Sequence, residues 1–237
     1  MKTREQYISL ANLFRYPDED YKKNVSECAK MLKENYHEAY SEILPFVQFV
    51  EANGLYEIEE VFGKTFHIQA ICFLDLGYVL FAEDYKRGEF LVKMKDEQRR
   101  ANNDCGDELA DNLPNVLTLM AIMKDEEFLG EFAVRIVEPS LEKMLAEFDQ
   151  ARMELKDKVR KKKQKVILLE DMQNKNIFQY AIKALWLVVK EDFKSIKYND
   201  PEIVPTIGGN FLKSCNTGCS TAPKLATGIP FGICTIE

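Results

Sequence analysis

Residues 126–149, EEFLGEFAVRIVEPSLEKMLAEFD, carry the clearest structural signal in the chain. Apolar side chains recur there every three or four positions, which places them on one face of an α-helix. The stretch therefore predicts an amphipathic helix, with a break near Pro139 because proline lacks the N–H that an interior helical turn needs. The apolar face consists of Phe128, Phe132, Ile136, Leu141, Met144, Leu145 and Phe148.

The same spacing recurs on both sides of this stretch, and strand-like alternation is absent from these segments. Gly and Pro are scarce up to about residue 190, and 46% of the 237 residues are hydrophobic, enough for a core. We predict an all-α protein: one bundle-like domain of about 8–10 helices over residues 1–195 and an irregular Gly/Pro/Cys-containing tail over 196–237. Further helices are expected over 3–14, 19–36, 39–52, 56–66, 83–101 and 176–193, with a loop followed by a helix over 107–123.

The run from Ile68 to Phe81 is apolar on nearly every side. A helix of this kind is normally the buried central helix of its domain. Its one acid, Asp75, needs a polar partner if it is buried. Asp75 is therefore a satisfied structural group, a residue that reaches the rim of the core, or a functional group.

The charge is distributed unevenly along the chain. Residues 1–150 hold 17 Lys and Arg against 30 Asp and Glu, whereas residues 151–237 hold 15 against 9. An acidic body argues against nucleic acid as a partner and suits a basic peptide or protein surface. The basic stretch at 156–165, KDKVRKKKQK, is either a solvated helix face or linker, or a contact for an acidic partner.

The N-terminal sequence shows no signal-peptide pattern, because its charges interrupt every apolar run. The longest apolar run is too short for a membrane span, which needs about 20 residues. We therefore expect a cytoplasmic protein that does not insert into a membrane.

Motifs of known catalytic chemistry are missing. The two histidines, His37 and His67, do not sit near a recognisable nucleophile, and no phosphate-binding glycine loop or zinc-protease motif occurs. We therefore do not expect an enzyme.

Three of the six cysteines, Cys215, Cys219 and Cys234, lie within the tail. Structural zinc usually takes four ligands, so this set is one ligand short and is only a weak metal site. Ordinary thiols, or thiols with a redox or partner-contact role, are the alternatives.

Residues 81–101, FAEDYKRGEFLVKMKDEQRRA, place Gly88 inside a charged helix directly after Arg87. Glycine weakens a helix by about 1 kcal/mol relative to alanine, so some packing gain should offset it. Gly88 could let a neighbouring helix or a bound peptide approach closely. Arg87 could pair with Glu83, one turn earlier, or with Asp111 across a groove. The alternative is a surface arginine beside a helix contact.

Four stretches, in this order, resemble the assembly chaperones of respiratory molybdoenzymes, and in particular the nitrate reductase assembly chaperones (the NarJ branch of the TorD/DmsD group). They are LANLFRYPDEDY at 10–21, FGKTF at 62–66, FAEDYKRGEFLVKM at 81–94 and ELADNLPNVLTLMA at 108–121. The chain departs from the family pattern at four positions: His67 replaces Asp, Ala82 replaces Gly, Ala110 replaces Pro and Asn112 replaces His.

The resemblance implies an all-α chaperone without catalytic turnover. It would bind the apo catalytic subunit of a molybdoenzyme such as nitrate reductase or nitrite oxidoreductase, often through that subunit's N-terminal segment. It would assist insertion of the molybdenum cofactor before membrane docking or export. It would hold no cofactor permanently, could touch the molybdenum cofactor transiently, and would work as a monomer or dimer.

The competing hypothesis is a small redox or metal-binding protein that uses the tail cysteines. For the chaperone hypothesis, the loop at 108–112 is the leading functional candidate, although Asp111 could instead cap the helix that follows and Phe66 could belong to the core. The candidate client-binding residues are Phe66, Glu83, Arg87, Gly88, Glu108, Asp111 and Asn112.

Overall fold

A computed structural model describes residues 4–68, 70–161 and 177–196 of the chain. The predicted all-α fold is confirmed, since these residues form helices and contain no β-strand beyond an isolated bridge between Asp75 and Asn112. The α-helices are α1 Glu5–Ala11, α2 Tyr21–Asn35, α3 His37–Ala52, α4 Leu55–Phe66, α5 Leu76–Phe81, α6 Lys86–Arg100, α7 Leu113–Ile122, α8 Glu126–Phe132, α9 Glu138–Lys161 and α11 Phe178–Phe193.

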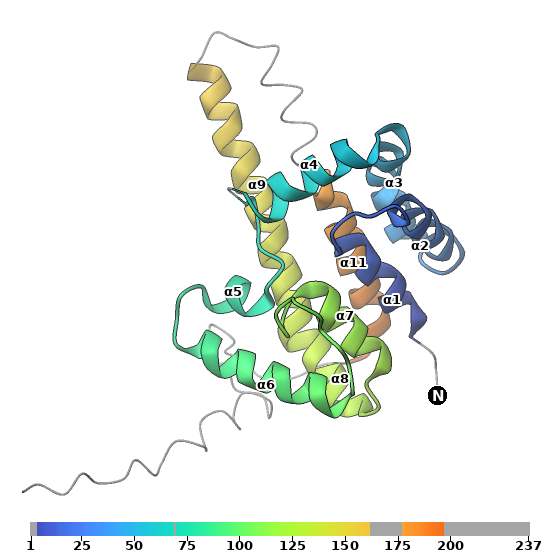
Figure 1. Cartoon of the computed structure of the whole chain (residues 1–237), viewed down its shortest axis with the longest axis vertical. Coiled ribbons are helices and arrows are strands. Elements are labelled where there is room, and N and C mark those ends of the chain that lie inside the picture. Colours follow the sequence, from blue (N-terminus) through green and yellow to red (C-terminus); the bar gives the residue numbers. More distant parts are fainter. Residues whose placement is uncertain (1–3, 69, 162–176, 197–237) are drawn as a thin grey trace, which may run out of the picture.

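The central helix is α11. It packs against α3 on one side and α9 on the other, while α1 lies along α7 (Figure 1). Its inward face is almost entirely removed from solvent, as expected for a helix with neighbours on both sides. The residues of this face are Phe178, Ala181, Ile182, Ala184, Leu185, Val188 and Val189.

The prediction of a buried helix over 68–81 is wrong. Of the described residues in this range, only Leu76–Phe81 are helical, and Ile68 is 74% exposed. The N–H groups of His67 and Ile68 both bond the carbonyl of Gly63, which ends α4. An apolar run without periodicity does not distinguish a helix from a covered loop. The chain uses these residues to cross from α4 to the far end of the domain (Figure 1).

The expected break near Pro139 takes another form. Residues Ala133–Val137 form a π-helical turn that joins α8 to α9 without interrupting the helical path. Pro139 lies in the first turn of α9, and the wider turn before it accommodates the missing N–H. The apolar face survives this turn, because Phe132, Ile136 and Phe148 are all buried.

Among the residues described, no helix combines the length and apolar character that crossing a membrane requires.

Candidate functional site

Several of the predicted site residues gather where α5, α6 and α7 meet. Arg87 and Gly88 lie in the first turn of α6, and Asp111 and Asn112 immediately precede α7. Glu83 is exposed in the turn between α5 and α6.

Backbone and side-chain hydrogen bonds join the start of α5 to the start of α7. Leu76 donates its N–H to the Asp111 carbonyl (3.0 Å), and Leu113 donates to the Leu74 carbonyl (2.9 Å). Asn112 Nδ2 donates to Asp75 Oδ1 at 3.1 Å, so the partner that Asp75 needed is a residue of the candidate loop. The two helix starts are therefore held as one unit.

Asp111 is the most unusual acid of this junction. It is 1% exposed, and its Oδ2 accepts the N–H of Gly77 at 2.8 Å. Its Oδ1 is buried and, within the described part of the chain, has no hydrogen-bond partner. Burial raises the pKa of Asp111, and nearby Asp75 adds to this, whereas the Gly77 hydrogen bond and the positive charge of Arg87 oppose it.

The prediction that Asp111 caps its own helix is wrong. No side chain caps α7, whose N-cap position is Asn112. The carboxylate of Asp111 instead satisfies the Gly77 N–H in the first turn of α5, one of the donors that a helix leaves unpaired at its start.

The glycine that permits close approach is Gly77, not Gly88. A Cβ atom at Gly77 would lie 2.6 Å from Asp111 Oδ2 and 3.0 Å from the Phe90 ring, whereas a Cβ at Gly88 would have nothing within 4 Å. The idea that a neighbouring helix requires Gly88 is therefore wrong. Close approach of a bound peptide at Gly88 stays a prediction.

Arg87 forms neither of the ion pairs predicted for it. Its guanidinium lies over the Tyr78 ring at 5.0 Å, a cation–π contact, rather than on Glu83 or Asp111. Tyr78 in turn contacts Phe73 edge-on, with ring centroids 4.4 Å apart. These three side chains contact one another in sequence and are partly exposed, with Tyr78 of α5 between Phe73 and Arg87 of α6.

The loop before α7 is fixed by a buried amide network that the sequence reasoning missed. Gln98 Nε2 donates to the carbonyls of Ala110 (2.8 Å) and Asn115 (3.2 Å). Asn103 Nδ2 donates to Gln98 Oε1 at 2.6 Å. Glu108 is exposed beside this network and lines a cleft of about 620 Å³ between the loop and α6. The sequence carries no signal of this network, because Gln98 lies in a charged helix and its partner Asn103 in the loop that follows.

Phe66 belongs to the core. It is 4% exposed and packs edge-on against Phe62 and Phe178, with ring centroids 5.0 Å away in both cases. Its buried aromatic contacts join α4 to α11.

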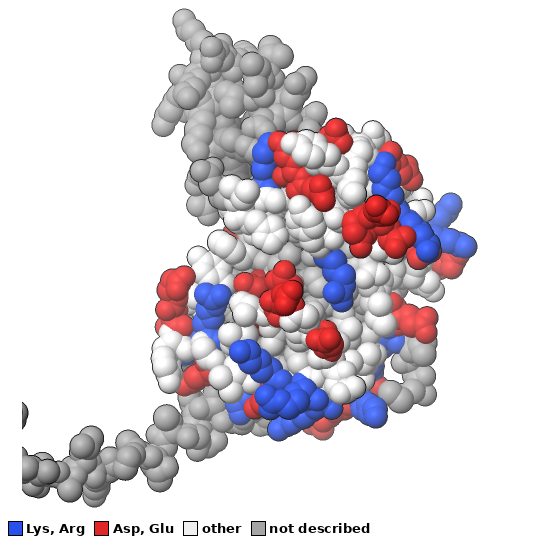
Figure 2. Space-filling view, viewed as in Figure 1, with Lys and Arg blue, Asp and Glu red and all other residues white. Residues whose placement is uncertain are grey.

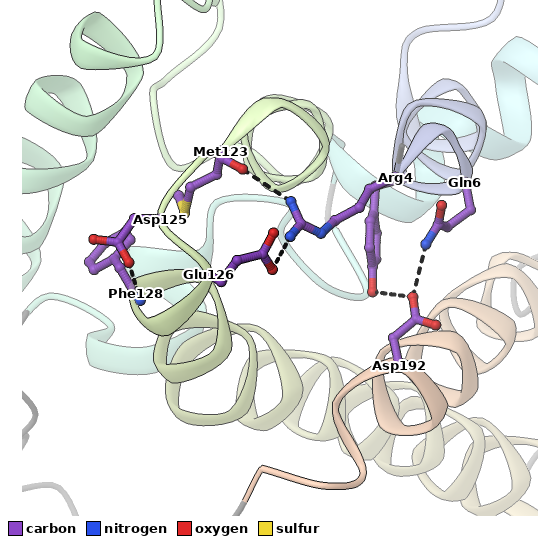
Figure 3. Close-up of polar contacts among 8 residues, drawn as sticks. Arg4, Gln6, Met123, Asp125, Glu126, Phe128 and Asp192 are labelled. Carbon is purple, nitrogen blue, oxygen red and sulfur yellow. Dashed lines mark hydrogen bonds and ion pairs between the residues drawn. The ribbon is translucent and has the colours of Figure 1, made fainter. Parts of the chain in front are cut away.

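A second polar centre lies at the end of α11, and it too was missed. The carboxylate of Asp192 accepts from Gln6 Nε2 (3.0 Å), the Tyr7 hydroxyl (2.8 Å) and the Tyr36 hydroxyl (2.8 Å). Figure 3 shows Gln6 reaching Asp192 from α1. Burial and the Asp192 charge raise the pKa of both tyrosines. Side chains so distant in sequence leave no local pattern.

This centre borders a cleft of about 800 Å³. On the other side of the cleft, Arg4 pairs with Glu126 and donates to the Met123 carbonyl at 3.0 Å (Figure 3). These contacts tie the start of α1 and the preceding Arg4 to both α8 and α11.

The acidic surface is dispersed. On the face seen in Figure 2, acidic side chains stand in separate groups with uncharged surface between them, and basic side chains gather at the lower edge. This face offers no single acidic patch for a basic partner.

The cysteines within the described ranges, Cys28, Cys72 and Cys105, are free thiols. Burial raises the pKa of Cys28 to about 12, which keeps it protonated. Within the described ranges, no three His, Cys, Asp or Glu side chains lie close enough together to hold a metal ion. The three tail cysteines lie outside the described residues, as does the basic stretch beyond Lys161.

A scan against models of known protein families finds no match to this chain. A search of curated proteins finds no significant match either.

Proposed function

We propose that this chain is an assembly chaperone that binds the apo catalytic subunit of a respiratory molybdoenzyme of the nitrate reductase or nitrite oxidoreductase type. It acts by binding the N-terminal segment of that subunit in the cytoplasm and releases it after the molybdenum cofactor is inserted. The protein has no catalytic turnover and no permanent cofactor.

One juxtaposition supports the proposal most directly. Arg87 and Phe90 come from one family-like stretch and Asp111 from another, and all three lie within 3.5 Å of the position that a Cβ at Gly77 would take. Two stretches selected only for their resemblance thus contribute to one compact junction.

The surface beside this junction suits a peptide. Phe73 is 38% exposed and Tyr85 is 79% exposed, and the Arg87 guanidinium lies over the Tyr78 ring. Partly exposed aromatic and arginine side chains are the types that most often anchor protein partners. An amphipathic client segment could place its apolar face on the aromatic rings.

The test is capture of the client from the native cytoplasm. The tagged full-length chain is expected to enrich a molybdopterin-type catalytic subunit, identified by mass spectrometry. An Arg87→Glu variant should capture at least about tenfold less, because it removes the arginine that lies over the Tyr78 ring at the proposed contact.

Arg100→Glu is the matched control, because Arg100 lies on the same helix and its side chain is 75% exposed. It should capture as much subunit as the wild type. Absence of any molybdoenzyme subunit, with the candidate client expressed, would refute the proposed function.

A further inference from the structure

The turn between α5 and α6 holds a strained residue. Ala82 has φ 50° and ψ −126°, and the N–H of Asp84 bonds the Phe81 carbonyl across it at 3.0 Å. This conformation at the second position of a turn is the type II′ geometry, which glycine adopts readily and alanine does not. Strain of this kind persists only where the surroundings hold it in place.

The two ends of α5 are held very differently. The start is fixed by the bonds of Leu76 and Gly77 to Asp111. The end is held by Lys143 Nζ, which donates to the Leu80 carbonyl at 3.1 Å, and by the cation–π contact of Arg87 with Tyr78. The last turn is therefore the weaker end, and it adjoins the strained residue.

The last turn of α5 covers an apolar surface. Phe81 is only half-buried, and its ring packs on Phe90 with centroids 5.6 Å apart. Phe90 itself is fully buried. Moving Phe81 aside would uncover the Phe90 ring, and the strain at Ala82 would be relieved by the same movement.

We propose that the last turn of α5 is a latch over a cryptic binding surface. The turn swings outward about the fixed Gly77–Asp111 joint, and an aromatic or aliphatic side chain of the client segment takes the place of the Phe81 ring on Phe90. The client side chain should be apolar, because it would occupy the position on Phe90 that the apolar Phe81 ring fills in the closed state. The proposal that a client side chain binds to Phe90 rests on the proposed function. The proposal that the last turn of α5 opens does not.

Native-state hydrogen exchange on the full-length chain tests the latch. The amide of Ala82, which bonds the Tyr78 carbonyl across the last turn of α5, should exchange about a hundredfold faster than the amides of α11, with little dependence on denaturant. Ala82→Gly should slow the α5 amides about fivefold, because glycine removes the strain that opening relieves. The latch would be overturned if the α5 amides exchanged only through global unfolding. It would also be overturned if their exchange rate were the same in Ala82→Gly as in the wild type.

Ala101→Gly is the matched control, because Ala101 ends α6 with an ordinary φ of −79°. It should not slow exchange in α5.

Client capture then tests the occupant. Ala82→Gly, which favours the closed latch, should capture about fivefold less subunit than wild type, and Ala101→Gly should capture as much. Equal capture by Ala82→Gly would overturn the cryptic surface while leaving the proposed function intact. If neither the wild type nor any variant captured a subunit, the proposed function would be refuted. Hydrogen exchange would still show whether the last turn of α5 opens.

Discussion

The carboxylate of Asp111 accepts the backbone N–H of Gly77 at 2.8 Å, although the two residues are 34 positions apart in the sequence. The contact needs the glycine, because a Cβ there would lie 2.6 Å from the accepting oxygen. Within the described residues, this hydrogen bond is one of four that join the start of α5 to the start of α7 and its preceding loop, where several candidate functional residues lie.

Gly77→Ala should destabilise the protein by about 2 kcal/mol. The added methyl group would displace the Asp111 carboxylate and press on Phe90, and these effects outweigh the gain of about 1 kcal/mol in helix propensity. Urea unfolding measures the change. Gly88→Ala is the matched control: its Cβ meets nothing, so it should stabilise the protein by about 0.5–1 kcal/mol. Equal effects of the two variants would contradict the close-approach role of Gly77.

Periodicity predicted the helices well where one face is apolar and the other polar. The helix expected over 83–101 is observed as Lys86–Arg100, and the one expected over 176–193 as Phe178–Phe193. It failed over 68–81, where no polar face marks the ends of α5. It also did not identify α11 as the central helix, because centrality depends on which helices pack around it.

The candidate site was predicted only as a set of residues. The partners of Asp75 and Asp111 lie on other elements, and neither pairing follows from sequence spacing. The same holds for Asp192, whose donors Tyr7 and Gln6 are 185 and 186 positions away. Such contacts arise from tertiary packing, and a single sequence carries no local pattern for them.

Asp111→Asn should change how stability depends on pH. Burial raises the pKa of Asp111 in the folded state above its unfolded value of about 3.9. The folded protein therefore holds this proton more tightly, so the stabilisation is complete below the unfolded pKa and is lost as pH rises through the folded pKa. Asparagine keeps an acceptor for Gly77 but does not titrate. Relative to the variant, the wild type should lose stability as the pH rises above about 4 and through the raised, folded-state pKa of Asp111.

Urea unfolding of both proteins across this pH range tests the prediction. Gly88→Ala changes no titratable group, so its difference from wild type should stay constant with pH. If the difference in unfolding free energy between the wild type and Asp111→Asn were also independent of pH, the Asp111 carboxylate would not contribute to the pH dependence of stability.

Phe66→Ala should cost about 3–5 kcal/mol of stability, because it removes a ring packed between Phe62 and Phe178. Tyr56→Ala, on the same helix but at a position 74% exposed, should change stability by no more than about 0.5 kcal/mol. Thermal or urea unfolding measures both. Normal stability of Phe66→Ala would mean that Phe66 serves binding rather than the core.

Asp192→Ala should destabilise the protein by about 2 kcal/mol, because it leaves the buried Tyr7 hydroxyl without its acceptor. Tyr7→Phe removes that hydroxyl, so the double variant Tyr7→Phe/Asp192→Ala should be less destabilised than the sum of the two single changes. Urea unfolding of the four proteins gives the coupling energy, expected to be about 1 kcal/mol or more. Additive effects would mean that the hydrogen bond does not tie α1 to the end of α11, and that apolar packing alone holds these helices together.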